Sequence, residues 1–296
     1  DVYRGIVPAE KSYVNLGTYL TMFPQLIAGP IVNYTEVSSC LKRRTVTARD
    51  FESGVRILVI GLGSKVIIAD RVGMLWNNVQ TIGFNSISTP LAWLGAVAYS
   101  MELYFDFAGY SMMAVGLGKM LGFQIPVNFR FPYISKSVTE FWRRWHISLG
   151  GWFRDYLYIP LGGNRVKPIR HVFNILVVWA ATGFWHGASW NFILWGLLFA
   201  VLLLFEKYIL HPKRRNAVFM HIYTMLFVVL GFVLFDSASI NDAFMSFKSL
   251  FGLAGIPAAN TASLYYLKSN LVLLIIAALG ATPLPKRIYE KLGGTA

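Results

Sequence analysis

The stretch that decides the fold of this chain begins with Phe141-Trp142-Arg143-Arg144-Trp145-His146 and ends with Gly183-Phe184-Trp185-His186-Gly187. In each of these two motifs a histidine directly follows a tryptophan, and an apolar segment separates the two motifs. Whether that segment crosses a membrane determines where His146 and His186 can act.

The composition indicates an integral membrane protein. Of the 296 residues, 55% are hydrophobic and 14% are charged, and the mean hydropathy is +0.52. A soluble domain has about 25% charged residues. The net charge of +13 comes from short basic blocks between apolar runs. This is the pattern of the positive-inside rule and not of a nucleic-acid-binding face. The single cysteine, Cys40, excludes an intrachain disulfide and a cysteine-based metal site.

Apolar runs predict about six full membrane spans, at residues 51–70, 91–121, 172–185, 189–206, 217–235 and 264–281. The run 91–121 is either one long helix or two pieces broken near Gly109, and residues 71–89 and 236–262 are expected to be loops. The fold prediction is an all-α polytopic membrane protein. A single transmembrane domain covers residues 1–296.

Two further segments predict helices that do not cross the membrane fully. Residues 13–32 include Pro24, Gly29 and Pro30, which favours a broken or re-entrant segment. Residues 122–170 mix arginine with tryptophan and tyrosine, which is typical of interfacial helices.

Basic blocks at residues 42–49, 130–170, 213–215 and 286–291 are all placed on the cytoplasmic side, because an even number of predicted spans separates each pair. This topology puts His146 at the cytoplasmic interface and His186 towards the outer half of the membrane. We expect a continuous cavity to connect them. A metal site that joins them is not expected, because they lie on opposite sides.

The other ionisable residues of the apolar runs have simpler interpretations. Glu102 and Asp106 are functional candidates by default, although hydrogen bonds to neighbouring helices or a basic partner are the favoured explanation. His171, His211 and His221 lie near span ends and are most simply interfacial.

The motifs at residues 141–149, 152–165 and 183–196 resemble those of the membrane-bound O-acyltransferases, and most of all the bacterial alginate O-acetyltransferase branch. Residues 24–31 and 104–111 are also similar to segments of that family. Gly150-Gly151 departs from the small polar pair of the branch. The chain starts at Asp1 and lacks the first spans of the family, so we expect a fragment that is incomplete at the N-terminus, and incompleteness at the C-terminus stays open.

The resemblance implies an O-acyltransferase with His186 as the catalytic residue and His146 required on the donor side. The donor is a cytoplasmic thioester, acetyl-CoA or an acyl carrier, and no bound cofactor or metal is expected. The acceptor is a hydroxyl of an exported polysaccharide or a periplasmic relay protein. The location is the bacterial inner membrane, among its lipids. Histidine suits this chemistry, because acyl transfer to a hydroxyl needs a base with a pKa near neutral.

Supporting roles follow for the neighbouring residues. Arg143, Arg144 and Arg154, with Trp145, are candidates for donor binding through phosphates, or for lipid headgroup anchoring. Trp185 and Asn191 are candidates for oxyanion support, or for packing.

Two alternative functions remain open from the sequence. The first is an acyl-group transport subunit whose partner does the chemistry. The second is D-alanyl transfer to teichoic acid. No Gly-x-Ser-x-Gly elbow supports a serine acyl-enzyme.

Overall fold

The structure is a computed structural model that describes residues 1–25, 29–83, 86–212 and 215–292. Every regular element in these ranges is helical, which confirms the all-α prediction. In chain order the α-helices are α1 (Tyr13–Thr21), α2 (Tyr34–Lys42), α3 (Ala48–Gly63), α4 (Asp70–Ile82), α5 (Thr89–Met120), α6 (Val138–Arg144), α7 (Ile147–Phe153), α8 (Pro168–His186), α9 (Trp190–Phe205), α10 (Ala217–Asp236), α11 (Ile240–Leu250), α12 (Thr261–Gly280) and α13 (Leu284–Lys291).

Short turns of other helix types join or extend these α-helices. The π-helical turns are η2 (Ser64–Ala69) between α3 and α4, η4 (Arg154–Tyr158) after α7, and η5 (Glu206–Leu210) after α9. The 3-10 turns are η1 (Phe23–Gln25) and η3 (Pro132–Ile134). The predicted re-entrant segment is broken at η1, and part of it, residues 26–28, lies outside the described residues, as do residues 213–214 of a basic block.

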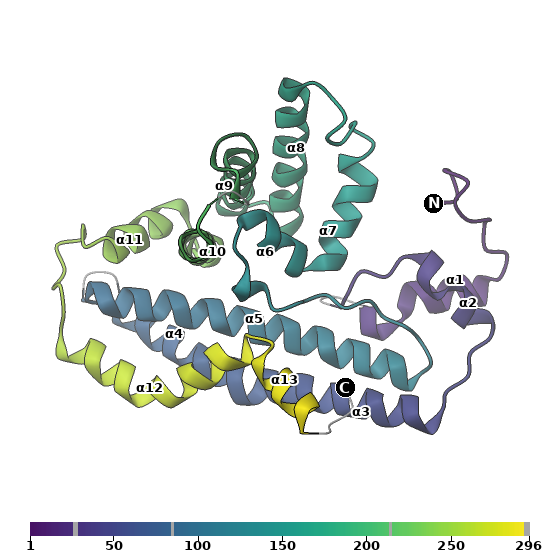
Figure 1. Cartoon of the computed structure of the whole chain (residues 1–296), viewed down its shortest axis with the longest axis horizontal. Coiled ribbons are helices and arrows are strands. Elements are labelled where there is room, and N and C mark those ends of the chain that lie inside the picture. Colours follow the sequence, from purple (N-terminus) through teal and green to yellow (C-terminus); the bar gives the residue numbers. More distant parts are fainter. Residues whose placement is uncertain (26–28, 84–85, 213–214, 293–296) are drawn as a thin grey trace.

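Helix α5 organises the molecule (Figure 1). It runs along the length of the view with α3 and α4 beside it and α12 on one side, while α6, α7 and α8 lie on the other side. Helices α9 and α10 are seen end-on beside α8. The short helix α6 sits at the junction: the Trp145 ring that follows it lies 5.1 Å from Phe232 of α10 and 6.3 Å from Tyr104 of α5.

Three helices are long and apolar enough to cross a membrane: Trp190–Leu210, Ala217–Asp236 and Thr261–Gly280. They coincide with the predicted spans at 189–206, 217–235 and 264–281. The break between the spans on either side of His186 is also confirmed, because α8 ends at His186 and α9 begins at Trp190. The total of about six spans stays a prediction.

The two predicted loops were partly wrong, because α4 and α11 lie within them. In α4 the buried residues Val72, Leu75 and Val79 recur every three or four positions and pack against α5. In α11 the Ser239 side chain caps the first turn. Burial of an apolar stripe outweighs the local preference of the asparagines and serines for turns.

Helix α5 is continuous at Gly109, and the glycine marks a helix crossing and not a break. A Cβ atom on Gly109 would lie 2.7 Å from the Gly61 carbonyl oxygen of α3. Gly54 and Gly116 make the same reciprocal contact further along. Small residues at these points let the two backbones approach closely, as in membrane helix pairs.

A buried carboxylate fastens α6 to the end of α9. Glu206 is 1% exposed. It accepts hydrogen bonds from the Val138 amide (2.6 Å), the Thr139 amide (2.9 Å) and the Thr139 hydroxyl (2.7 Å). These amides have no partner inside the helix, so the carboxylate replaces water at the N-terminus of α6.

We expect Glu206→Ala to lower the free energy of unfolding by about 3 kcal/mol, because it leaves buried amide donors without an acceptor. The measurement is the Tm of the detergent-solubilised protein. Glu290→Ala is the control, since Glu290 only approaches Lys286 at 3.7 Å on the surface of α13 and should change stability by less than about 0.5 kcal/mol. Equal Tm values for the two variants would contradict the capping role.

Candidate active site

A cavity of about 1720 Å³ lies between the α6–α7 segment and helices α8 and α9. Helix α8 contributes one stripe of side chains to its wall, with spacings of three and four residues: His171, Ile175, Val178, Trp179, Thr182 and His186. The helix rises about 1.5 Å per residue, so His171 and His186 are separated by about 22 Å along its axis. The cavity therefore follows α8 over nearly its whole length.

His186 lies at the C-terminal end of α8 in an aromatic pocket. Its imidazole centroid is 4.9 Å from Trp185, 5.2 Å from Trp195 and 5.1 Å from Phe235, with all three rings edge-on. No hydrogen bond to this imidazole comes from the part of the chain that the structure describes. Its ring nitrogens are therefore available to a molecule in the cavity.

Two glycines position His186 by bringing the backbones of α8 and α9 into contact. A Cβ atom on Gly183 would lie 2.3 Å from the Phe192 carbonyl oxygen. A Cβ atom on Gly196 would lie 2.2 Å from the Trp179 carbonyl oxygen. Any side chain at either position would push the helices apart, and the Trp195 ring away from His186.

His146 is held in a left-handed backbone conformation between α6 and α7, with φ 45° and ψ 54°. This conformation is uncommon for a residue with a side chain and needs support from its surroundings. Asn128, which is 1% exposed, supplies it. The Asn128 carbonyl oxygen accepts from the Ile147 amide (3.0 Å) and its Oδ1 accepts from the Ser148 amide (3.0 Å) and hydroxyl (3.0 Å).

The same Asn128 oxygen sets the tautomer of His146. Oδ1 lies 3.3 Å from His146 Nδ1, and because Oδ1 is an acceptor, Nδ1 carries the proton and Nε2 keeps its lone pair. Burial, together with a smaller effect of the nearby His186, lowers the pKa of His146, which lies outside the three candidate spans, to about 3. The imidazole is neutral at physiological pH.

The two histidines lie at the same end of the cavity. The Trp185 indole centroid is 6.1 Å from His146 and 4.9 Å from His186, and both histidines line the cavity. The cavity expected between them is present, but their predicted separation to opposite ends of a span is wrong. The α6–α7 segment folds back against the last half of α8, where Trp142 packs on Trp179 (4.9 Å).

One premise of the sequence argument against a shared metal site, the separation of the two histidines in space, is therefore wrong. Groups of three or more His, Cys, Asp or Glu side chains that could hold a metal ion do not occur among the described residues. The absence of a metal stays a prediction.

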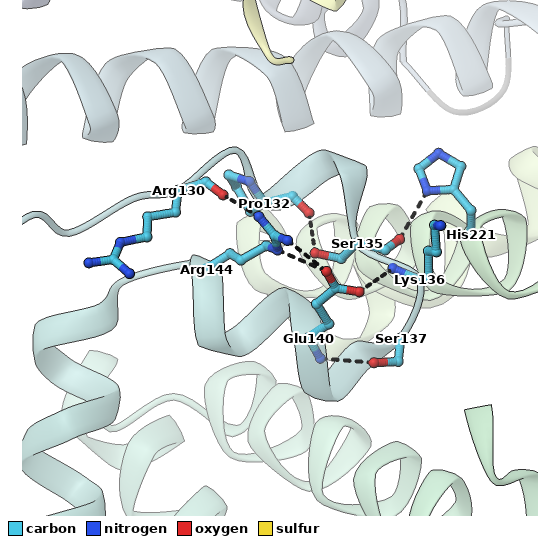
Figure 2. A network of polar contacts seen from close by, with 8 residues as sticks. All are labelled: Arg130, Pro132, Ser135, Lys136, Ser137, Glu140, Arg144 and His221. Atoms are coloured by element: carbon cyan, nitrogen blue, oxygen red, sulfur yellow. Dashed lines mark hydrogen bonds and ion pairs between the residues drawn. The ribbon is translucent and has the colours of Figure 1, made fainter. Parts of the chain in front are cut away.

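The predicted donor-binding residues divide into two groups. Arg143, Arg154 and Trp145 line the cavity, although Arg154 is paired with Asp155 at 2.7 Å. Arg144 does not line it, and its role in donor binding stays a prediction. Figure 2 shows the Arg144 guanidinium turned toward Glu140, to which it donates at 2.8 and 3.0 Å, while it also donates to the Arg130 carbonyl at 3.1 Å.

Asn191 makes structural contacts, and its role in oxyanion support stays a prediction. It lies outside the cavity wall. Its Nδ2 donates to the carbonyl oxygens of Phe235 (3.2 Å) and Ser237 (2.9 Å), so it joins α9 to the end of α10. Trp185 packs against both imidazoles, and its oxyanion role stays a prediction.

Asp106, His221 and His171 each have an ion-pair or hydrogen-bond partner. Asp106 forms an ion pair with Lys65, which agrees with the interpretation that a basic residue pairs with this carboxylate. Lys65 also contacts Asp70 at 3.0 Å. His221 contacts the Ser135 carbonyl at 2.9 Å (Figure 2). His171 is 4% exposed and hydrogen-bonded at the cavity wall, and its interfacial position stays a prediction.

Sequence reasoning missed Asn128, His171 and Glu206 as functional or positioning residues. His171 had a usable signal, because His171 and His186 directly flank the predicted span 172–185, and a helix extended by one residue at each end carries both histidines. Asn128 had none, since it lies in an irregular segment whose partner His146 is brought to it only by the fold.

The fold and the cavity define an all-helical membrane protein with two imidazoles at one end of a long internal site. A family model described as MBOAT, the membrane-bound O-acyltransferase family, matches residues 9–241. The chain belongs to this family.

Named relatives extend the comparison. The probable alginate O-acetylase AlgI of Pseudomonas putida is 41% identical over 85% of this chain and 52% of its own length. The peptidoglycan O-acetyltransferase of Helicobacter pylori is 37% identical over 82% and 48% of the two chains. The teichoic acid D-alanyltransferase of Bacillus subtilis is 32% identical over 78% and 63%. The chain spans about half the length of the first of these relatives.

We expect Gly196→Ala to lower the Tm of the purified protein by several degrees, because the new Cβ atom must displace the Trp179 backbone. Gly17→Ala is the matched control: Gly17 lies in α1, and no atom lies within 4 Å of the place that a methyl group would take there, so the change should be neutral or slightly stabilising. If the two variants have the same Tm, the packing of α8 against α9 does not depend on this contact.

Proposed function

We propose that the cavity is the active site of an O-acyltransferase that moves an acyl group, most simply acetyl, from a cytoplasmic thioester to a hydroxyl. The single observation that carries this proposal is the meeting of His146 and His186 at one end of a cavity whose wall also holds Arg143 and Arg154. Family membership and the activities named for the relatives support it.

His186 is the general base in this proposal. Its imidazole takes the proton from the acceptor hydroxyl while the hydroxyl oxygen attacks the thioester carbonyl carbon. The carbon–oxygen bond forms and the carbon–sulfur bond breaks. The thiolate then takes the proton from the His186 imidazolium, so an ester and a free thiol leave a neutral enzyme.

His146 acts beside the reacting atoms as a neutral acceptor. Its Nδ1–H is committed to Asn128, so only Nε2 can contact a substrate. A neutral ring with a single exposed lone pair can orient a donor amide or the acceptor hydroxyl next to His186 without adding a second positive charge.

The acceptor is a hydroxyl of an exported polysaccharide or of a periplasmic relay protein, and the location is the bacterial inner membrane. The positive-inside pattern supports a cytoplasmic donor side. The D-alanyltransferase relative supports a second candidate, D-alanyl transfer to teichoic acid. Higher identity to the alginate O-acetylases makes acetyl transfer the first proposal.

We expect His186→Ala to reduce acyl transfer by about 10²- to 10⁴-fold, the usual contribution of a general base. The assay uses purified protein, a thioester donor and a small hydroxyl acceptor. His221→Ala is the control, because His221 contacts the Ser135 backbone outside the cavity wall. Undiminished transfer by His186→Ala would overturn the assignment, whereas a wild-type protein that forms no product alone would favour an acyl-group transport subunit.

We expect Asn128→Ala to reduce transfer by about 10²-fold, because His146 loses the contact that orients it. Asn128→Asp distinguishes positioning from folding. A carboxylate beside Nδ1 raises the pKa of His146, so the acidic limb of the pH–rate profile should move to higher pH. A profile identical to that of the wild type would show that Asn128 does not act through His146.

A further inference from the structure

The end of the cavity opposite His186 carries a hydrogen-bonded group that the mechanism above does not use. Its centre is the buried imidazole of His171. Nε2 of His171 lies 3.0 Å from the Tyr158 hydroxyl and 3.0 Å from Lys207 Nζ, and Nδ1 lies 3.0 Å from the Tyr208 hydroxyl. The four residues come from η4, α8 and η5.

The proton arrangement in this group follows from Lys207. An ammonium can only donate hydrogen bonds, so His171 Nε2 accepts from Lys207, and the neutral ring carries its proton on Nδ1, which donates to Tyr208. His171 therefore fixes the direction of the Lys207 ammonium at the cavity wall. Two of its three N–H groups are not used by the described residues.

The negative charges on the cavity wall are already committed elsewhere. Glu206 is bonded to the start of α6, Glu140 to Arg144, and Asp155 to Arg154. Glu36 accepts from the Asn33 amide at 2.9 Å. None of these carboxylates pairs with Lys207, so its charge is not neutralised within the described residues.

A second cation lies near Lys207 on the same wall. Arg215 donates to the Leu210 carbonyl at 3.2 Å, at the end of the π-helical turn that contains Lys207. Arg215 lines the cavity and forms no ion pair among the described residues. Two cations thus lie at the His171 end of the cavity, while His146 and His186 line the other end.

We propose that Lys207, positioned by His171, binds the phosphate that both candidate donors, acetyl-CoA and an acyl-carrier thioester, carry beside their thioester arm. This inference rests on the proposed function. Such a donor carries its phosphate and its thioester at opposite ends of a long flexible chain. That chain matches a cavity whose cationic end and His186 end are separated by about 22 Å of α8. A hydrogen bond from the Lys207 ammonium to a phosphate is charge-assisted and therefore stronger than a hydrogen bond between neutral groups.

Binding and kinetics on the purified full chain test this proposal. We expect Lys207→Ala to weaken binding of CoA, measured by calorimetry, by roughly 10- to 100-fold, the worth of one hydrogen bond between charged groups. In the transfer assay it should raise the KM for acetyl-CoA by a similar factor and leave kcat nearly unchanged. With S-acetylpantetheine, which has the same thioester chain and no phosphate, wild type and Lys207→Ala should be equal.

His171→Ala should reproduce the Lys207→Ala pattern, with a loss for acetyl-CoA and none for S-acetylpantetheine. Lys207→Arg, which keeps a cation, should recover most of the affinity for CoA. Arg170→Ala is the matched control: Arg170 is the neighbour of His171 on α8, lies over the Phe173 ring at 5.1 Å and does not line the cavity.

Several results would overturn the proposal. Equal loss with both donors would show that Lys207 and His171 have only a structural role, and no loss with either would show that Lys207 does not bind the donor. A Lys207→Ala defect that appears in vesicles containing phosphatidylglycerol and vanishes in phosphatidylcholine alone would assign Lys207 to a lipid headgroup.

Two comparisons distinguish which donor supplies the phosphate and whether the proposed function holds. A Lys207→Ala defect with an acyl-carrier thioester as well as acetyl-CoA supports the phosphate that both share, while a defect with one donor alone identifies that donor as the source. CoA that binds through Lys207 to a protein with no transferase activity would refute the proposed function and keep the phosphate site.

Discussion

The close contact between the backbones of α8 and α9 is the constraint on which the site depends. Gly183 and Gly196 leave no room for a side chain between the two helices. This contact places the Trp195 ring against His186 and presents one face of α8 to the cavity. Packing of α6 against the same pair, through Trp142, then brings His146 to the same end. A helix pair held by small residues is rigid enough to position catalytic side chains.

The cavity combines two environments that a protein interior rarely places together. At one end, aromatic rings surround the imidazoles of His146 and His186, and a low-polarity setting of this kind strengthens each remaining hydrogen bond. At the other end, cations outnumber the carboxylates that are free to pair with them. The carboxylates on the wall are used by backbone amides and arginines, as Glu206 is used by α6. An anionic molecule with a long neutral arm is the ligand that suits both ends.

Several features were predicted from the sequence because they depend on local properties of the chain. Length and hydropathy of the apolar runs were enough to predict the spans that correspond to α9, α10 and α12. The residues Gly187-Ala188-Ser189 were enough to predict the break after His186. The helices α4 and α11 were missed because their burial against other elements outweighs the turn preference of their polar residues. The contacts of Asn191 could not be predicted, because they are made with the backbone near Phe235, which is distant in sequence.

The sequence by itself determined the class of this protein: a helical membrane protein with two Trp-His motifs, whose family membership the comparisons confirm. Only the tertiary structure decided which histidines meet. Charge patterns report on which side of a membrane a loop lies, but not how deeply an interfacial segment folds back between the helices. The position of the α6–α7 segment between the helices is set by the packing of its aromatic side chains and by the left-handed backbone conformation at His146. It makes His171, and not His146, the histidine at the far end of α8.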